Sequence, residues 1–247
     1  MKNKYIIALA LLIIVALIIA EPVYAGPGGF VAKGISKSWW GKLLLLALAV
    51  IFLPLIIYIR SREYLSVRQN MKVLSKLGFI NTDFRWSFLE KNTRNIYGRV
   101  YTAWSKENLE EVSSLVSSWY WQNQQLVVLD EWKRNNLKNI CRLQSVGKVR
   151  PLHLEITDQE NLEGSRIAFS IEAKVEDYLV NRDTRTVVYG EMGIQDDQKI
   201  WILEYTNGNW LLDEIREGEL SLAFAKMKNI IPDKLPNPIR ESRASIR

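Results

Sequence analysis

The sequence predicts an α+β fold in which membrane segments at the N-terminus lead into a domain of helices packed on an antiparallel sheet. Two apolar runs fall within the first 59 residues. Apolar residues then recur every three or four positions through residues 82–140, which is typical of amphipathic helices. From Val149 they alternate with polar residues, as in half-buried antiparallel strands. Because the helices precede the strands and do not alternate with them, separate layers are favoured over a parallel βα architecture.

Residues 1–25 have the three parts of a signal peptide. Lys2 and Lys4 precede an apolar run at 5–20, and Val23 and Ala25 supply a small-residue cleavage site. The alternative is an uncleaved first transmembrane helix, although the run is slightly shorter than the ~20 residues that a bilayer requires. Residues 26–42 are a short Gly-rich arm, which is a free end if the signal is cleaved and a link between two spans if it is not.

Residues 43–59 predict a transmembrane helix because they carry no charge and are flanked by interfacial aromatic residues. Pro54 lies inside the run, and membrane helices tolerate proline. Basic residues are more numerous after this run than before it, so the positive-inside rule puts residues 60–247 in the cytoplasm. We therefore expect a protein of the bacterial inner membrane with a cytoplasmic domain. The flanking aromatic residues are Trp39, Trp40 and Tyr58.

The formal net charge of +6 arises within residues 1–62, which hold seven basic residues and one acidic residue. Residues 63–247 hold 26 of each sign, since 33 − 7 = 26 and 27 − 1 = 26. The excess lies beside the apolar runs, as topology signals do. The basic pI is therefore no evidence for a nucleic-acid partner, and no direct nucleic-acid binding is predicted.

Residues 60–78 predict a basic amphipathic helix next to the membrane. Arg68, Lys72 and Lys76 form an i, i+4, i+8 row on one face, and Gly78 stands where the helix would end. Such a row would contact an anionic leaflet at ~1 kcal/mol per basic residue. The alternative is an ordinary solvated helix face. The apolar face holds Tyr64, Val67, Met71 and Leu74.

Three helices are expected within residues 82–140, the second of them opened by a capping box of Asn108 and Glu111. Cys141 follows Leu137 and Ile140 on the third helix and is expected to be a buried structural thiol. The expected inward residues are Phe84, Phe88, Tyr97, Val100, Tyr101 and Trp104 in the first helix, Leu109, Val112, Val116 and Trp119 in the second, and Leu126, Leu129, Trp132, Leu137 and Ile140 in the third.

The strands begin near Val149. In LHLEIT the alternation puts His153 on the exposed face, and in RIAFSIEAKVEDYLV it puts Ile167 to Val175 on the buried face. Asp177 would share that buried face if the alternation continues, or would lie in solvent if the strand ends there. RTVVYGEMGI and KIWILEY follow, joined at Asp196-Asp197, and Asn207-Gly208 predicts a tight hairpin. Residues 231–247 are expected to be disordered.

The chain has one cysteine and one histidine. An intrachain disulfide, a Cys-rich zinc site and a two-His metal pair are therefore excluded. No cofactor is expected.

Residues 80–230 resemble the Tim forty-four-like family, the C-terminal domain of the mitochondrial import-motor tether. The resemblance rests on a helix junction and a pair of strands, whose residues are Ala103, Trp104 and Leu109, and Trp201, Leu203, Asn209, Trp210 and Leu212. It implies the nuclear-transport-factor-like cone fold, with a curved sheet that encloses an apolar pocket. The tether binds anionic lipid and connects a translocon to a chaperone motor. This chain differs in having its own transmembrane helix and no long chaperone-contacting region, which puts motor recruitment in doubt.

The sequence thus favours a membrane-anchored scaffold that is not an enzyme and whose partners are anionic lipid and a membrane-protein partner, in membrane-protein transport or assembly. Two alternatives stay open. Residues 133–150 hold six basic residues and no acidic one, which would suit ribosome docking. A small-ligand enzyme in the cone pocket would use a buried carboxylate such as Asp177. The candidate partner or pocket residues, which would otherwise fill the core, are Trp119, Trp121, Trp201 and Trp210.

Overall fold

The structure, a computed structural model, describes residues 39–233 and 235. The chain divides into two compact units, Met1–Ser61 and Arg62–Arg247. The predicted signal peptide at 1–25, most of the arm at 26–42 and most of the tail at 231–247 lie outside the described residues. Helices and an antiparallel sheet make up the described chain, so the predicted α+β class is confirmed.

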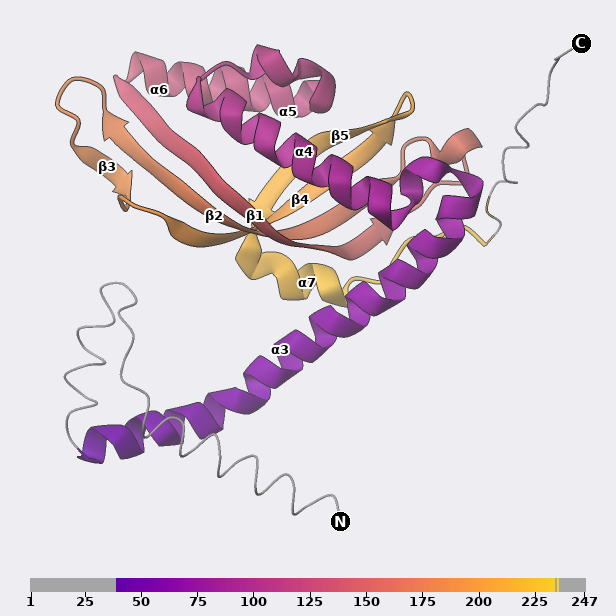
Figure 1. Cartoon of the computed structure of the whole chain (residues 1–247), viewed down its shortest axis with the longest axis horizontal. Coiled ribbons are helices and arrows are strands. Elements are labelled where there is room, and N and C mark those ends of the chain that lie inside the picture. The colour runs from indigo at the N-terminus through magenta and orange to yellow at the C-terminus, as the bar shows by residue number, and fades with distance from the viewer. Residues whose placement is uncertain (1–38, 234, 236–247) are drawn as a thin grey trace, which may run out of the picture. The chain divides into compact units, whose positions relative to one another are not determined.

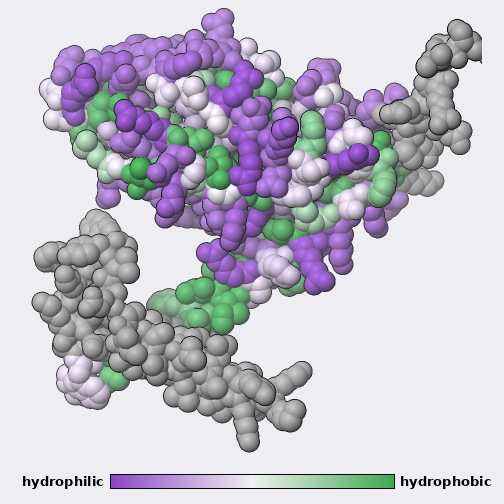
Figure 2. All heavy atoms as spheres, viewed as in Figure 1, coloured by the Kyte–Doolittle hydropathy of each residue, from purple (hydrophilic) through white to green (hydrophobic). Residues whose placement is uncertain are grey.

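Helix α3 (Trp39–Ile80) is long and apolar enough to cross a membrane, and none of its most apolar window is buried. Its apolar side chains are seen as green spheres in Figure 2. The helix runs without a break through both predicted segments, 43–59 and 60–78. Gly78 does not end it as predicted. A Cβ at Gly78 would lie 2.8 Å from Cγ of Arg85, so the glycine instead allows the chain to pack closely after the helix.

The sheet of the second unit is antiparallel throughout, with strand order β1-β2-β4-β5, and β3 pairs with the far end of β2. It is strongly curved (Figure 1). The strands are β1 (Leu137–Glu155), β2 (Arg166–Asn181), β3 (Val187–Gly190), β4 (Gln195–Thr206) and β5 (Asn209–Glu217). Asn207 and Gly208 have φ values of 52° and 73° between β4 and β5, which confirms the predicted tight hairpin.

Helices α4 (Trp86–Ser105), α5 (Ser118–Gln122) and α6 (Asp130–Arg134) cover the concave face of the sheet, and α7 (Ser221–Lys226) lies on the opposite face (Figure 1). The 3₁₀ helices are η1 (Thr82–Phe84), η2 (Leu109–Leu115), η4 (Glu160–Leu162) and η5 (Gly218–Leu220), and η3 (Asn123–Leu129) is a π-helix. The main core lies between the concave face and α4, and a smaller cluster around Ile200 and Ile202 lies on the other face. The predicted inward row Ile167, Phe169, Ile171, Ala173 and Val175 belongs to the main core.

The second predicted helix is wrong in type and length. Residues Leu109–Leu115 form a 3₁₀ helix, which ends because Val116 pairs with Leu212 of β5 as an isolated bridge. A new helix, α5, begins at Ser118 and does not continue the helical periodicity of η2. Trp119 is therefore 56 % exposed and does not point inward as predicted.

The predicted capping box is only half formed. The Asn108 side chain accepts a hydrogen bond from the Glu110 amide at 3.1 Å. The Glu111 carboxylate pairs with Lys106 at 2.7 Å and does not return to the cap. In the first helix, Phe88 is 44 % exposed and so is not inward as predicted.

The third predicted helix is also wrong beyond Arg134, where α6 ends. Leu137, Ile140 and Cys141 lie in β1, which pairs with β2 along its length and begins well before Val149. The helical spacing of these residues is overridden by the long partner strand, since a strand is stabilised by its cross-strand neighbours more than by its own propensity.

Two further strand predictions need correction. His153 is 5 % exposed, not solvated. It pairs with Ala168 on the face opposite Leu154, as the alternation predicts, but this face is covered there by the second buried cluster, which includes Ala225 of α7. Asp196 and Asp197 do not link two strands, since both lie inside β4. The link between β3 and β4 is residues 191–194.

Candidate functional site

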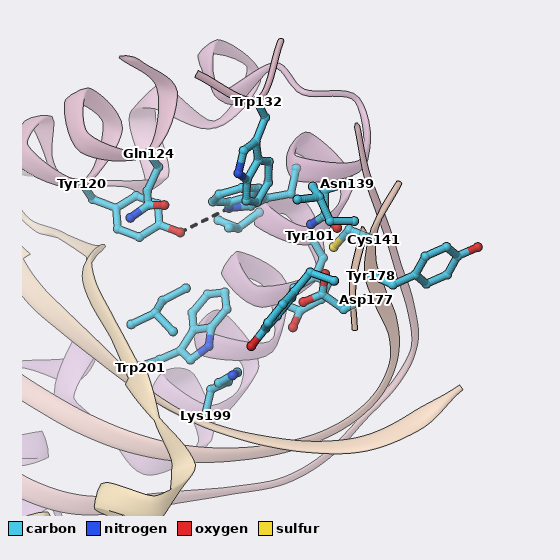
Figure 3. A pocket seen from close by; sticks show the side chains of 15 residues that line it. Tyr101, Tyr120, Gln124, Trp132, Asn139, Cys141, Asp177, Tyr178, Lys199 and Trp201 are labelled. Carbon is cyan, nitrogen blue, oxygen red and sulfur yellow. Dashed lines mark hydrogen bonds between the residues drawn. The ribbon is translucent and has the colours of Figure 1, made fainter. Parts of the chain in front are cut away.

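A pocket of about 370 Å³ opens between the helices on the concave face and the β3 end of the sheet (Figure 3). This volume is within the range of small-molecule sites. Its lining combines aromatic and aliphatic side chains with a few polar ones: Val100, Tyr101, Trp104, Tyr120, Gln124, Trp132, Asn139, Cys141, Asp177, Tyr178, Leu179, Tyr189, Lys199, Trp201 and Ile215.

Strand alternation places the polar residues of the pocket. On β4, Lys199 and Trp201 share the concave face. On β2, the alternation that begins at Ile167 continues to Asp177, which lines the pocket and is also exposed to solvent. The sequence left two positions open for Asp177, the buried face of its strand or solvent, and each is partly correct. Asp177 lies on the apolar face of β2 and also at the open side of the pocket.

Stacked rings form one wall of the pocket. The ring centroids of Tyr97 and Trp201 are 4.4 Å apart, and those of Tyr97 and Tyr101 are 4.6 Å apart. Burial raises the pKa of the Tyr101 hydroxyl well above its ordinary value, and the neighbouring Tyr97 hydroxyl raises it further. Such a wall offers a large apolar surface with the aromatic faces held in fixed positions.

The opposite wall comes from the helices. The indoles of Trp104 and Trp132 lie 5.8 Å apart, and Trp104 Nε1 donates a hydrogen bond to the Tyr120 hydroxyl at 3.3 Å (Figure 3). Burial raises the pKa of Tyr120 as well, so its hydroxyl stays protonated at physiological pH. The Trp104 indole N–H therefore has its acceptor within this wall.

Charged groups gather beside the pocket on β4 and β5. Lys199 Nζ lies 2.6 Å from a carboxylate oxygen of Glu217 and 3.8 Å from one of Asp197. Burial tends to lower the pKa of Lys199, but the Glu217 hydrogen bond and the charges of Asp197, Glu217 and Asp177 outweigh it and raise the pKa. Burial raises the pKa of Asp197, and the Lys199 charge opposes that shift. Lys199 is therefore a charged and already neutralised group.

Cys141 lies directly opposite Asp177 in the register of β1 and β2, and it is 5 % exposed. Burial, with a further contribution from the Asp177 charge, raises the pKa of the thiol to about 12. A thiol that stays protonated at neutral pH is a weak nucleophile. The geometry therefore places Cys141 in the pocket wall as a buried, protonated thiol.

Trp201 and Asp177 each place in the pocket a polar group without a partner among the residues that the structure describes. Trp201 Nε1 is fully buried and donates no hydrogen bond there. Asp177 has no Lys or Arg nitrogen from the described chain within 4.0 Å of its carboxylate. Figure 3 shows the Trp201 ring nitrogen on the side of the pocket where Asp177 and Lys199 lie.

Of the four tryptophans proposed from the sequence, Trp201 lines the pocket. Trp210 is buried in a separate aromatic cluster with Phe84, and Trp121 is half-buried against the main core. Trp119 is exposed on α5. Sequence reasoning missed Trp132 as a pocket residue because the helix around it was extended too far.

The basic row Arg68, Lys72 and Lys76 is exposed along α3, while Leu74 and Leu77 on the same helix are fully buried. The row therefore lies on a solvated face, and contact with lipid stays a prediction.

The basic stretch at 133–150 is mostly strand β1 and not the helix face assumed from the sequence. Arg150 pairs with Glu172 at 2.5 Å and Arg142 with Glu176 at 3.5 Å. Carboxylates of β2 therefore offset part of its charge, and ribosome docking stays a prediction.

No protein-family model matches the chain, and no curated protein matches it. Among solved structures, the chain is similar to the intermembrane space region of the chloroplast protein ARC6, with a TM-score of 0.35 and 9 % sequence identity over 51 % of this chain and 94 % of that one.

Proposed function

We propose that this protein is a membrane-anchored binding module, with α3 as its anchor and a small-ligand site in the pocket on the concave face of the sheet. The proposal places the anchor in a bacterial inner membrane and the folded domain in the cytoplasm. A part in membrane-protein transport or assembly is an expectation from the family resemblance alone.

The pocket is the observation that supports this function. It offers about 370 Å³ beside Trp201, a volume within the range of small-molecule sites, and it is lined mainly by aromatic and aliphatic side chains. The unpartnered indole N–H supports the same conclusion, because a buried donor without an acceptor costs about 1–3 kcal/mol. A ligand with apolar parts and an oxygen acceptor would fill the pocket and pair with this donor.

A second surface suits the membrane anchor. Arg68, Lys72 and Lys76 are exposed on α3 after its apolar part. Each charge close to an anionic leaflet contributes ~1 kcal/mol. Because α3 already anchors the chain in this proposal, the row would orient the domain and not attach it. Replacement of all three by Ser should leave the chain in the membrane fraction.

An acid–base enzyme in the same pocket is the second candidate, favoured by the presence of both Asp177 and Lys199 in its lining. Lys199 is engaged by Glu217 and Asp197, so it is poorly placed to donate or accept a proton in a reaction. A binding function accounts for the same residues without requiring either to change its protonation state.

The test is to fill the pocket. Leu179→Trp adds bulk to the lining, and Val188→Trp on neighbouring β3 adds it at an exposed position outside the lining. The full-length protein is extracted from its native membrane in mild detergent and analysed by native mass spectrometry. We expect a small molecule to be retained by the wild type and by Val188→Trp, and to be lost from Leu179→Trp.

Far-UV circular dichroism of each variant verifies that the fold is kept. A wild type that retains no small molecule, or a Leu179→Trp variant that is folded and retains it equally, would contradict a ligand site in this pocket.

A further inference from the structure

The open side of the pocket carries an excess of negative charge. Among the described residues, Lys199 is the one basic residue of the lining, and Glu217 and Asp197 lie 2.6 and 3.8 Å from its ammonium group. The two negative charges of these carboxylates exceed the single positive charge of Lys199. Asp177 adds a third carboxylate, which has no ion pair among the described residues. An anionic ligand would therefore meet repulsion, and a cationic ligand would meet an available counter-ion.

The apolar lining suits one kind of cation. Tyr101, Trp104, Trp132 and Trp201 line the same space as Asp177. Aromatic faces attract ammonium groups through their negative π surface, and aromatic cages are a common way to bind quaternary ammonium ions. A metal ion suits this lining poorly, because Ca²⁺ takes six to eight oxygen ligands and Mg²⁺ six.

We infer that the pocket binds an organic ammonium group, with Asp177 as its counter-ion and the tyrosine and tryptophan rings around its alkyl substituents. This inference rests on the proposed function, since it names the ligand class of the same site. The ammonium group is either that of a free solute or that of a lipid headgroup, and both share the chemistry that the pocket recognises.

The chain supplies its own reporter for the test. Cys141 is the only cysteine, lines the pocket and lies opposite Asp177 in the β1–β2 register. A ligand on Asp177 would block access to the thiol. The full-length protein in phosphatidylglycerol nanodiscs is treated with methyl methanethiosulfonate, a small neutral reagent, and the rate of Cys141 modification is followed by mass spectrometry.

The probes are choline and its neutral isostere, 3,3-dimethylbutan-1-ol. At choline concentrations about ten times its Kd, modification should slow about tenfold, because only the unoccupied fraction reacts. The isostere, with the same shape and no charge, should not protect at the same concentration. Equal protection by the two compounds would overturn the preference for a cation and would leave a pocket for neutral ligands. Protection by neither would overturn the inference.

Asp177→Asn isolates the counter-ion. It should raise the choline concentration needed for half-protection about fivefold, as expected for loss of one partly exposed charge pair. Asp196→Asn is the matched control, because that side chain is 87 % exposed and does not line the pocket. Each variant is compared with itself without choline, since loss of the Asp177 charge also changes thiol reactivity. Unchanged half-protection in Asp177→Asn would overturn the assigned role.

A last arm separates the two sources of the ammonium group. In nanodiscs that contain phosphatidylethanolamine, slower modification of Cys141 without added choline supports a lipid headgroup. An equal rate in both kinds of nanodisc, together with protection by choline, supports a free solute.

Discussion

The two ends of the concave face are built from the same kinds of residue and differ in how their polar atoms are satisfied. At the hairpin end, the rings of Phe84, Tyr205 and Trp210 contact one another with centroids 4.8–5.1 Å apart. At the pocket end, Trp201 stacks on Tyr97 at 4.4 Å. The two ends are thus similar in aromatic packing.

Their hydrogen bonds are different. Trp210 Nε1 donates to the Asp83 carbonyl at 3.1 Å, and the Tyr205 hydroxyl donates to the Asp83 carboxylate at 2.8 Å and accepts from Asn81 at 3.0 Å. At the pocket end, Trp201 Nε1 has no partner in the described chain. A closed cluster with every donor used stabilises the fold, whereas an open one with a spare donor is suited to binding. Aromatic content alone therefore does not distinguish core from site.

The largest expected effect is at the hairpin end. Trp210→Ala should lower the free energy of unfolding by about 3–5 kcal/mol, because it removes a large buried side chain and leaves the Asp83 carbonyl without its donor. Urea unfolding of the full-length protein in detergent micelles, followed by far-UV circular dichroism, measures it.

Trp119→Ala is the matched control, since Trp119 is 56 % exposed on α5. It should lower the free energy of unfolding by ~0.5 kcal/mol, as surface substitutions usually do. Similar losses for the two variants would mean that the hairpin-end cluster is not part of the stabilising core.

The second-largest expected effect comes from a substitution in the β4–β5 hairpin. Gly208→Val should destabilise the domain by about 1–2 kcal/mol, because Gly208 has a φ of 73° and a residue with a branched Cβ is strained in that region. The added Cβ would meet nothing within 4 Å, so the loss would come from backbone strain and not from a clash. The midpoint of urea unfolding should fall while its slope stays the same. An unchanged midpoint would show that this turn is not held in its positive-φ form.

The sequence predicts the strands better than the helices, and the reason is physical. The period-two row on β2 follows the face that packs in the main core, so Ile167 to Val175 and even Asp177 could be placed from the pattern. The hairpin could be predicted because Asn-Gly fits its turn type directly. These signals are local and do not depend on distant partners.

The helical layer depends on contacts that no local pattern contains. The helix predicted from Leu109 is interrupted because Val116 pairs with Leu212, almost a hundred residues later in the chain. Leu137 to Cys141 have helical spacing but pair with the end of β2. The lining of the pocket could not be predicted in full for the same reason. Trp132 from the helices and Lys199 from the sheet come together only in the folded domain.

The smallest predicted effect is a pH dependence that begins at the pocket end. Folding raises the pKa of Cys141 from its ordinary value of 9.0 to about 12, mainly through burial, so above pH 9 the unfolded chain loses a proton that the folded chain keeps. The stability that this thiol contributes is complete below pH 9 and is lost as the pH rises towards 12. Between pH 9 and 10 the free energy of unfolding should fall by about 1 kcal/mol, since one pH unit corresponds to at most about 1.4 kcal/mol for one group.

At the hairpin end, burial raises the pKa of Tyr205 from 10.0 to about 12, helped by the hydrogen bond to Asp83 and opposed by the hydrogen bond from Asn81, so its contribution is lost only above pH 10. Cys141 therefore begins to lose its contribution about one pH unit below Tyr205. Urea unfolding under reducing conditions at pH 8, 9, 10 and 11 follows both losses. Cys141→Ala should reduce the decrease between pH 9 and 10 and keep the later one, to which Tyr101 and Tyr120 of the pocket end also contribute because burial raises their pKa. Tyr205→Phe should keep most of the first decrease and reduce the second. If Cys141→Ala keeps the full decrease between pH 9 and 10, the thiol is not shielded by the pocket wall as described.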